Sequence, residues 1–348
     1  MVIQGDGYLG KERFMPGIGV ISNRNARLNK LHPELKDELA YVIGSNGEVS
    51  STGTITDAYK AVETFRKIGI DLIAISGGDG TAHRTLEIVV DVYGNHKIPP
   101  ILLLPTGTQN MVPRSFGIDG SGLANLMLAM LKYRHNVPMQ CIRRNLLRVN
   151  NHLSFMFGFG VAARFMVKYY ESGQTNPKGA AKLLTQLIAS SVVGSELIKQ
   201  MMSEVKVRVE QDGNVVSDAP IHTFFASFVE RLPLHFVLFP EAGHHEGQFE
   251  VAYSGVAPLK IAQQFPIVLR GGAVDTNVIT HSLASKLVLD LEHPEAYTLD
   301  GELYPATDHF DIESGPELEF VIPALQHRAE DSNLRYSQSG PWAMRFLL

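Results

Sequence analysis

The first 138 residues alternate short apolar segments with longer amphipathic ones, and this alternation limits the fold more than any other feature. The predicted strands are residues 17–22, 70–76 and 98–105. Between the first two, the stretch 55–69 carries apolar residues at helical spacing and ends on Gly69, a common helix terminator. Strands separated by helices pair in parallel through right-handed crossovers, with helices on both faces of the sheet. We therefore expect residues 14–138 to form a doubly wound α/β domain.

A different pattern begins after Val137, where short segments alternate apolar and polar residues between turns rich in Gly, Pro, Asp and Asn. This spacing is typical of antiparallel structure, and it predicts a β-sandwich domain over residues 139–325. One helical interruption is expected at residues 179–204. The tail, residues 326–348, is expected to dock back onto the body of the protein.

The bulk composition narrows the class of protein. The chain has 348 residues, enough for two domains, and 45% of them are hydrophobic, so a sizeable core can form. Its formal net charge of -5 argues against a nucleic-acid partner, which requires a basic surface. Cys141, the single cysteine, cannot form an internal disulfide. No apolar run reaches the roughly 20 residues that span a bilayer, so we expect a cytoplasmic protein.

Three loops that follow predicted strands are polar or rich in glycine. They are residues 23–26, 77–81 and 105–110. Loops at the carboxyl ends of parallel strands meet at one edge of the sheet, where ligands bind. Glycine lets phosphate oxygens approach the backbone, and the N-terminus of the following helix offers free N–H groups. The loops therefore predict a phosphate-binding site, in which Asp79 would hold a magnesium ion or contact an attacking hydroxyl.

A structural interpretation of the same loops stays open. The glycines could simply close tight turns, and Asp79 could cap the next helix. The loops match neither the Walker A sequence nor the dinucleotide-binding pattern G-x-G-x-x-G. A P-loop enzyme and a Rossmann dehydrogenase are therefore poor interpretations.

Five segments along the chain carry recurring patterns of Gly, Asp and Asn. They are NRNA (23–26), ISGGDGT (75–81), PTGTQNMVPRSFGI (105–118), FGFGVAARF (157–165) and YTLDGE (297–302). In order and spacing they resemble the diacylglycerol kinase catalytic-domain superfamily of lipid kinases, which includes sphingosine kinases and bacterial relatives. The resemblance implies an ATP-dependent enzyme that phosphorylates a lipid hydroxyl, with its active site in the cleft between the α/β domain and the β-sandwich.

The resemblance also implies roles for individual residues. Asp300 would be the general base, with Asp79 as the second catalytic carboxylate. Glu302 would help to bind Mg²⁺, and Glu246 would serve with it. By sequence alone, however, Asp300 and Gly301 could equally form a simple hairpin turn. The nucleotide-binding residues implied are Asn23, Gly77, Gly78, Asp79, Gly80, Thr81, Thr106, Gly107, Thr108, Asn110 and Arg114.

The chain departs from the family pattern at several of these motifs. Met111 and Ala162 stand where relatives carry an acidic residue, and His83 with Arg84 replaces the usual Asn-Glu pair. Glu246 stands where an Asp-Gly is common. A carboxylate replaced by Met or Ala cannot hold a cation, so at least one family ion contact is in doubt. Arg84 either adds positive charge near the phosphates or is a solvated helix residue.

The sequence says less about the acceptor. Four arginines between residues 134 and 148 and the apolar helix at 183–202 could contact a membrane surface and an acyl chain, or could be ordinary surface and core residues. We expect peripheral association with the membrane that carries the lipid substrate. The identity of that lipid and the presence of a homo-oligomer stay open.

Two other functions remain compatible with the sequence. An NAD kinase-like enzyme with a soluble substrate also carries Gly-Gly-Asp-Gly, although the late Asp-Gly-Glu motif and the missing Asn-Glu pair fit it less well. A non-catalytic nucleotide or lipid binder is the other alternative, and Met111 and Ala162 are its support.

Overall fold

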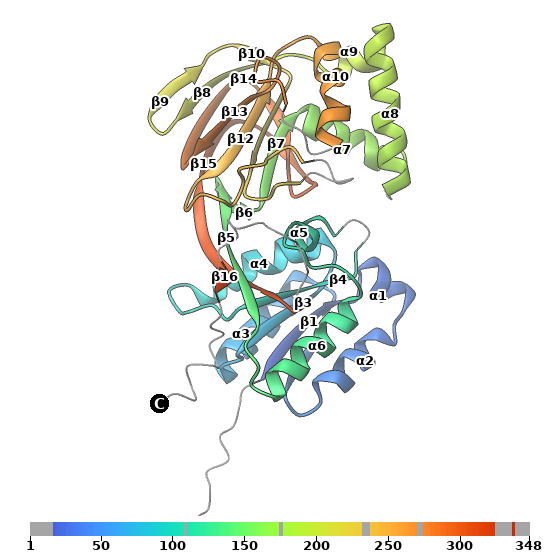
Figure 1. Cartoon of the computed structure of the whole chain (residues 1–348), viewed down its shortest axis with the longest axis vertical. Helices are drawn as coiled ribbons and strands as arrows, with labels where there is room; N and C mark the ends of the chain where they lie inside the picture. Colours follow the sequence, from blue (N-terminus) through green and yellow to red (C-terminus); the bar gives the residue numbers. More distant parts are fainter. Residues whose placement is uncertain are drawn as a thin grey trace, which may run out of the picture.

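The protein consists of two lobes joined by long strands (Figure 1). The structure is a computed structural model that describes residues 17–107, 110–173, 177–231, 237–269, 274–323 and 336–337. The chain passes between the lobes on β5 (Gln140–Val149) and β15 (Glu302–Ile322), which pair in antiparallel fashion. Both connections are therefore strands of a sheet, and the lobes are linked by backbone hydrogen bonds.

The N-terminal lobe contains a parallel sheet in the order β4-β3-β1-β2. Its strands are β1 (Ile18–Asn23), β2 (Gly47–Thr52), β3 (Leu72–Gly77) and β4 (Ile101–Pro105). Its helices are α1 (Arg27–Leu31), α2 (Leu35–Ile43), α3 (Ile55–Ile68), α4 (Asp79–Tyr93), α5 (Met111–Ser115) and α6 (Gly122–Arg134). The predicted α/β pattern is confirmed. The sequence did not predict β2, because this edge strand is polar and only its last residue is buried.

Side chains that alternate along the buried strands explain why helices cover both faces of this sheet. Ile73 and Ile75 of β3 pack in one apolar cluster with residues of α3 and α4. The intervening Leu72 and Ala74 pack in a second cluster with residues of α2 and α6. The glycine-rich loops follow β3 and β4 at the carboxyl ends of these strands.

The C-terminal lobe is built from antiparallel strands around one aromatic core. Besides β5 and β15, its strands are β6 (His152–Ser154), β7 (Met156–Gly160), β8 (Val205–Gln211), β9 (Asn214–Ser217), β10 (Pro220–Ile221), β11 (Thr223–Ser227), β12 (Phe249–Ser254), β13 (Thr280–Ala284) and β14 (Lys286–Leu299). The first half of β14 pairs with β8 and its last residues pair with β7. The sandwich prediction implies two separate sheets, whereas the observed hydrogen bonding is continuous through β14.

Four helices accompany this sheet on one side (Figure 1). They are α7 (Val161–Glu171), α8 (Pro177–Val193), α9 (Glu196–Met201) and α10 (Pro258–Leu269). The single helix predicted at 179–204 is divided into α8 and α9, because Gly194 adopts a left-handed conformation with φ +65°. No helix in the described part of the chain is long and apolar enough to cross a bilayer.

The two lobes share residues of β5 and β15. Phe320, near the end of β15, pairs with Ile101 of β4 in the N-terminal sheet, and both belong to an apolar cluster that extends from the N-terminal lobe into the C-terminal lobe. The predicted domain boundaries at residues 138 and 325 stay predictions. Of the predicted tail 326–348, only β16 (Tyr336–Ser337) lies within the described residues, and it pairs with β5.

Candidate active site

The two glycine-rich loops of the N-terminal lobe touch each other. A Cβ atom placed on Gly107 would overlap the Cα of Gly78, and one on Gly78 would lie 3.1 Å from the Cα of Gly107. The Thr106 amide donates to the Gly77 carbonyl at 3.2 Å. The loops after β3 and β4 therefore form one continuous backbone surface at the sheet edge, as expected from the sequence, and a side chain at either contact would separate them.

Two asparagines fix the shape of this surface. The side chain of Asn110 accepts from the Gly107 amide at 2.9 Å and donates to the Gly107 carbonyl at 3.1 Å. The Asn23 amide donates to Thr81 Oγ1 at 2.8 Å, which ties the first polar loop to helix α4. Both asparagines thus hold the loops in place through side-chain hydrogen bonds. Thr108, also predicted to bind the nucleotide, lies outside the described residues.

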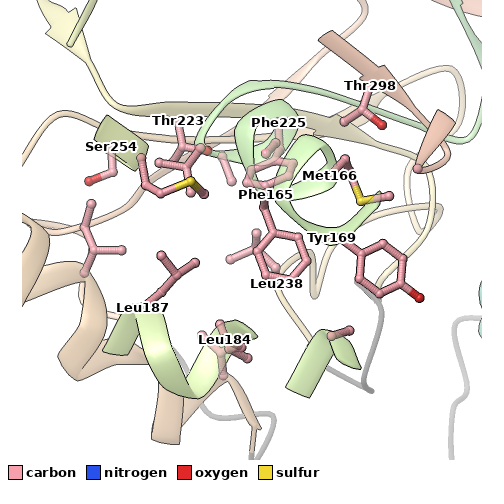
Figure 2. Close-up of a pocket in the computed structure, with 18 of the residues that line it drawn as sticks. Phe165, Met166, Tyr169, Leu184, Leu187, Thr223, Phe225, Leu238, Ser254 and Thr298 are labelled. Carbon is pink, nitrogen blue, oxygen red and sulfur yellow. The ribbon is translucent and has the colours of Figure 1, made fainter. Parts of the chain in front are cut away.

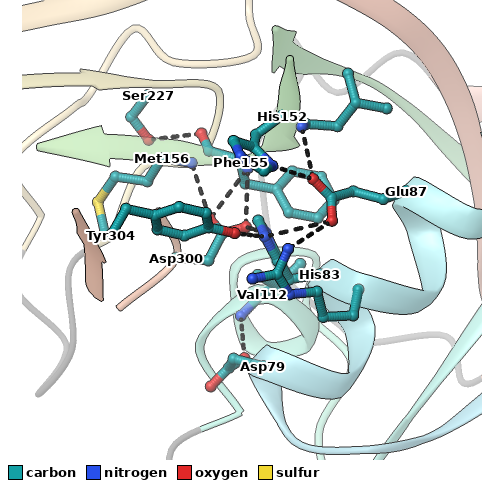
Figure 3. Close-up of polar contacts among 12 residues, drawn as sticks. Asp79, His83, Glu87, Val112, His152, Phe155, Met156, Ser227, Asp300 and Tyr304 are labelled. Carbon is teal, nitrogen blue, oxygen red and sulfur yellow. Dashed lines mark hydrogen bonds and ion pairs between the residues drawn. The ribbon is translucent and has the colours of Figure 1, made fainter. Parts of the chain in front are cut away.

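Asp79 occupies the first turn of α4, directly after the cap residue Gly78. Its Oδ1 accepts a hydrogen bond from the Val112 amide at 3.1 Å (Figure 3). Burial of the carboxyl is the main cause that raises its pKa, and the negative charge of Asp300 raises it further. The amides of Met111 and Val112 and the charge of Arg114 act in the opposite direction. A carboxyl with a raised pKa is a stronger base, which suits proton transfer.

Asp300 lies at the tip of the hairpin that joins β14 to β15. Asp300 and Gly301 have φ values of 50° and 90°, and Leu299 pairs with Glu302 across the turn. This is the two-residue Asp-Gly hairpin turn that the sequence left open. The carboxylate nevertheless points inward and is 1% exposed. Asp300 therefore forms the predicted hairpin turn and also lies at the candidate site.

Both oxygens of Asp300 accept hydrogen bonds (Figure 3). The amide of Phe155 lies 3.0 Å from Oδ1 and 3.1 Å from Oδ2, and the Met156 amide donates to Oδ1 at 2.9 Å. His83 Nδ1 lies 3.0 Å from Oδ2. The general base implied by the resemblance is thus held by donors from both lobes in this conformation.

His83 is a residue of the site that the sequence analysis noticed only as a departure. It is buried, and its second ring nitrogen, Nε2, lies 3.0 Å from the hydroxyl of Tyr304. Burial raises the pKa of Tyr304, so this hydroxyl keeps its proton and can donate it. The spacing of Asp79, His83 and Glu87 at four-residue intervals is the signal that could have placed all three on one face of α4.

Glu87 continues this face toward the C-terminal lobe. Its Oε1 accepts from the Leu153 amide at 3.1 Å and lies 3.2 Å from His152 Nδ1. Arg84 pairs with Glu87 Oε2 at 3.0 Å, and its guanidinium lies 5.2 Å from the centre of the Tyr304 ring. The structure therefore places Arg84 against Glu87 and Tyr304.

The two predicted metal ligands are separated in the structure. Glu302 lies against Gly80 at the start of α4 and lines the same cavity as Asp79 and Asp300. Glu246 is exposed on the turn before β12 and does not line that cavity. Within the described ranges, no three His, Cys, Asp or Glu side chains are grouped to hold a metal ion. The structure therefore does not support Glu246 as a partner of Glu302.

An apolar cavity of about 480 Å³ leads from these carboxylates into the C-terminal lobe. Its floor includes residues of the sheet such as Phe225, and its walls come from the four helices (Figure 2). Helical side chains that line it include Phe165, Met166, Tyr169, Leu184, Leu187 and Met201. The helix that the sequence assigned either to an acyl-chain groove or to an ordinary core therefore forms one wall of a cavity.

Met111 and Ala162, the two departures from the family pattern noted in the sequence, both line the cavity. Met111 comes from α5 and Ala162 from α7, and both are buried. Their apolar side chains extend the cavity wall toward Asp79 and Asp300. The departures from the family pattern thus replace potential ion ligands with apolar surface.

The arginines predicted near a membrane surface are engaged within the protein. Arg143 pairs with Glu319 at 2.9 Å, and Arg148 pairs with Glu313 at 3.3 Å, in each case between β5 and β15. Arg144 is buried. Arg134, the fourth, is exposed and donates to the Val42 carbonyl at 3.3 Å. Contact of this stretch with a membrane surface stays a prediction.

Comparison with solved structures shows a similar fold. The structure resembles a candidate diacylglycerol kinase from Bacillus anthracis strain Sterne with a TM-score of 0.64 and 17% identity, covering 88% of this chain and 95% of that one. A diacylglycerol kinase structure from the same organism gives a TM-score of 0.60 and 16% identity, covering 88% and 96%. At such identities the likeness shows the fold alone.

The sequence itself gives a family match over the N-terminal lobe. No curated protein matches the chain. Residues 18–142, however, match the profile of the diacylglycerol kinase catalytic domain. This segment contains the glycine-rich loops, Asp79 and the supporting asparagines, so the resemblance noted from the motifs is confirmed. Over residues 18–142 the chain is therefore similar to the catalytic domain of diacylglycerol kinases.

Proposed function

We propose that this protein is a lipid kinase that transfers the γ-phosphate of ATP to the hydroxyl group of a lipid. One observation carries the proposal: a single apolar cavity opens beside Asp79 and Asp300, at the edge where the glycine-rich loops meet. A phosphate site and an apolar chain site thus converge on the same two carboxylates. A soluble acceptor would gain little from such a cavity.

The nucleotide phosphates would bind at the backbone surface of the two loops. Gly78 and Gly107 leave the backbone open to a close approach, and α4 begins at Asp79 with free N–H groups in its first turn. Arg114 lies near enough to Asp79 to affect its pKa, and it can also pair with a phosphate oxygen. These groups suit phosphoryl transfer, in which positioning and charge neutralisation do most of the work.

The geometry favours Asp79 as the group that accepts the proton of the lipid hydroxyl. Asp79 is partly exposed and its pKa is raised, whereas the carboxylate of Asp300 is 1% exposed and bound on both oxygens. The charge of Asp300 contributes to the raised pKa of Asp79. We therefore propose a division of roles in which Asp300 orients the site and strengthens Asp79 as a base, a revision of the base role that the resemblance implies for Asp300.

Magnesium suits the carboxylates at this place. Mg²⁺ is commonly bound by one or two carboxylates together with substrate phosphates, so a complete protein cage is unnecessary. Glu302, which lines the same cavity as Asp79, is the residue that would hold it. When bound there, the ion would neutralise charge on the transferred phosphate.

The apolar chain of the acceptor would lie between the sheet and helices α7 to α10. Each CH₂ group moved from water into an apolar site contributes about 0.8 kcal/mol, so the chain can supply most of the acceptor's binding energy. The hydroxyl end would then remain at the polar mouth. Because such a substrate resides in membranes, we propose peripheral association of this lobe with a membrane surface.

A non-catalytic lipid or nucleotide binder is a second candidate function. The observation that favours it is the closed state of Asp300, whose oxygens are both occupied, together with the apolar residues Met111 and Ala162 at lost acidic positions. Such a protein would keep the cavity and the loops while lacking phosphoryl transfer.

The test is incubation of the protein with labelled ATP, magnesium and a total lipid extract in mixed micelles, followed by separation of the products. We expect a labelled phospholipid that is absent with the Asp79→Asn variant. When NAD is added as a soluble acceptor, transfer of label to NAD alone would favour the NAD kinase-like alternative. ATP binding without any labelled product would favour the non-catalytic binder.

A further inference from the structure

Helix α4 presents a polar stripe to the C-terminal lobe. The stripe consists of Asp79, His83 and Glu87, one on each successive turn. Asp79 faces the cavity mouth, while His83 and Glu87 contact residues of the other lobe (Figure 3). Helix α4 thus begins at the proposed phosphate site and, through His83, also contacts the hairpin that carries Asp300.

The central contact of the stripe is a buried pair. The side chains of His83 and Asp300 are 0% and 1% exposed, and Nδ1 lies 3.0 Å from Oδ2. An ion or dipole contact in such surroundings is stronger than at the surface, and an unmet partner there is costly. The pair joins the two lobes, because His83 belongs to α4 and Asp300 to the β14–β15 hairpin.

The hydrogen bonds around the pair determine which nitrogen of His83 carries its proton. Asp300 accepts from the amides of Phe155 and Met156, so its carboxylate acts as an acceptor toward His83 as well. Nδ1 must then be the donor. Nε2 lies 3.0 Å from the hydroxyl of Tyr304, whose proton it can accept, and 3.9 Å from Glu87 Oε2, so we infer the Nδ1-protonated tautomer.

We propose that His83 is a positioning residue for phosphoryl transfer: its Nδ1–H holds the Asp300 carboxylate in register with Asp79, and so sets the hairpin of one lobe against the phosphate site of the other. The proposal rests on the proposed kinase function. A correctly placed pair of groups contributes to catalysis even when one of them never touches the substrate, because small misplacements lower the rate strongly.

The contact has a simple chemical requirement, which is a donor at the place of Nδ1. An asparagine amide can supply that donor, whereas leucine fills a similar volume without one. We expect His83→Leu to lower kcat about 100-fold while the KM for ATP changes by less than about twofold. His83→Asn should keep kcat within about tenfold of the wild type. His222→Asn, at another buried histidine, is the matched control and should change kcat by less than about threefold.

The kinetic result separates a positioning role from a merely structural one. If His83→Asn loses as much turnover as His83→Leu while its melting temperature is unchanged, or if His83→Leu keeps full turnover, the proposal is overturned. A wild-type protein without lipid kinase activity would overturn the proposed function and with it this role, whereas an inactive asparagine variant beside an active wild type would overturn the role of His83 alone.

A measurement that needs no activity completes the test. In protein labelled with ¹⁵N-histidine, the ring signals that disappear in His83→Asn belong to His83. At about pH 8, where an ordinary imidazole is neutral, we expect these signals to report the Nδ1-protonated tautomer. The Nε2-protonated tautomer would contradict the hydrogen-bond direction on which the proposal depends.

Discussion

The two ends of the candidate site are built in opposite ways. The end proposed to bind phosphate is made of backbone: the loops at Gly78 and Gly107 meet without side chains between them, and the side chains of Asn110 and Asn23 hydrogen-bond to them. The end proposed to bind the acceptor is made of side chains: aliphatic and aromatic residues of four helices and a sheet line one apolar cavity. A site made of backbone tolerates few substitutions, because any side chain added at the glycines would occupy space that the contact between the loops requires. In a cavity lined by many side chains, a single substitution can change which ligand fits while the rest of the lining stays in place.

Substitution of Asp79, where the two ends meet, should have the largest effect. Asp79→Asn removes the proposed proton acceptor, and we expect kcat to fall about 10³-fold, within the range known for general-base catalysis. Nucleotide affinity should be maintained, because a negative charge near the phosphates is removed. Steady-state kinetics and nucleotide titration measure both quantities.

Asp300→Asn is the comparison that sharpens this result. An asparagine can still accept from the Phe155 and Met156 amides, so the hairpin should keep its place and the loss in kcat should be about tenfold smaller than for Asp79→Asn. A greater loss at Asp300 than at Asp79 would return the base role to Asp300.

Adding a single methyl group at the backbone end should weaken ATP binding. In Gly107→Ala the new Cβ would overlap the Cα of Gly78, so the two loops must separate, and we expect the KM for ATP to rise about tenfold. Gly78→Ala places its Cβ 3.1 Å from Gly107 and should have a weaker effect of the same kind. An unchanged KM for ATP in Gly107→Ala would mean that the phosphates bind elsewhere.

The cavity end should respond only on the acceptor side. Leu187→Trp fills part of the cavity from α8, and we expect the KM for the lipid to rise about tenfold with ATP binding unchanged. Leu183 lies on the same helix without lining the cavity, so Leu183→Trp is the matched control and should leave lipid binding intact. Equal effects of the two variants would argue that the chain binds outside the cavity.

The smallest expected effect is on stability. The pKa of Asp79 is raised in the folded protein, so ionisation of this carboxyl opposes folding as the pH rises above its unfolded value. Asp79→Asn should therefore raise the melting temperature by a few degrees at about pH 7. The difference should vanish as the pH falls below about 3, where the carboxyl is neutral in both the folded and the unfolded protein. Thermal unfolding without magnesium measures this, and a lower melting temperature for the variant would contradict the assigned direction.

The sequence anticipated the backbone end far better than the cavity end. Gly77, Gly78 and Asp79 form a local pattern after an apolar strand, and the parallel fold then brings this loop to Gly107 without further information. The cavity could not be predicted in this way, because Phe165, Leu187 and their neighbours come from separate helices whose packing depends on the whole lobe.

The contacts between the lobes were hidden for the same reason. His83 and Asp300 are 217 residues apart, and the residues around either one do not predict that the two side chains are in contact. The hairpin geometry at Asp300 was visible in the sequence, yet only the fold shows that its carboxylate points inward. The available clue was the four-residue spacing of Asp79, His83 and Glu87 along one predicted helix.

The most direct test of the central claim is a crystal structure of the protein with a non-hydrolysable ATP analogue, magnesium and a lipid alcohol. We predict that the terminal phosphates contact the backbone at Gly78 and Gly107, that the lipid chain occupies the cavity beneath α8, and that its hydroxyl lies beside Asp79. Phosphates bound away from both glycines, or a lipid chain outside the cavity, would contradict the account.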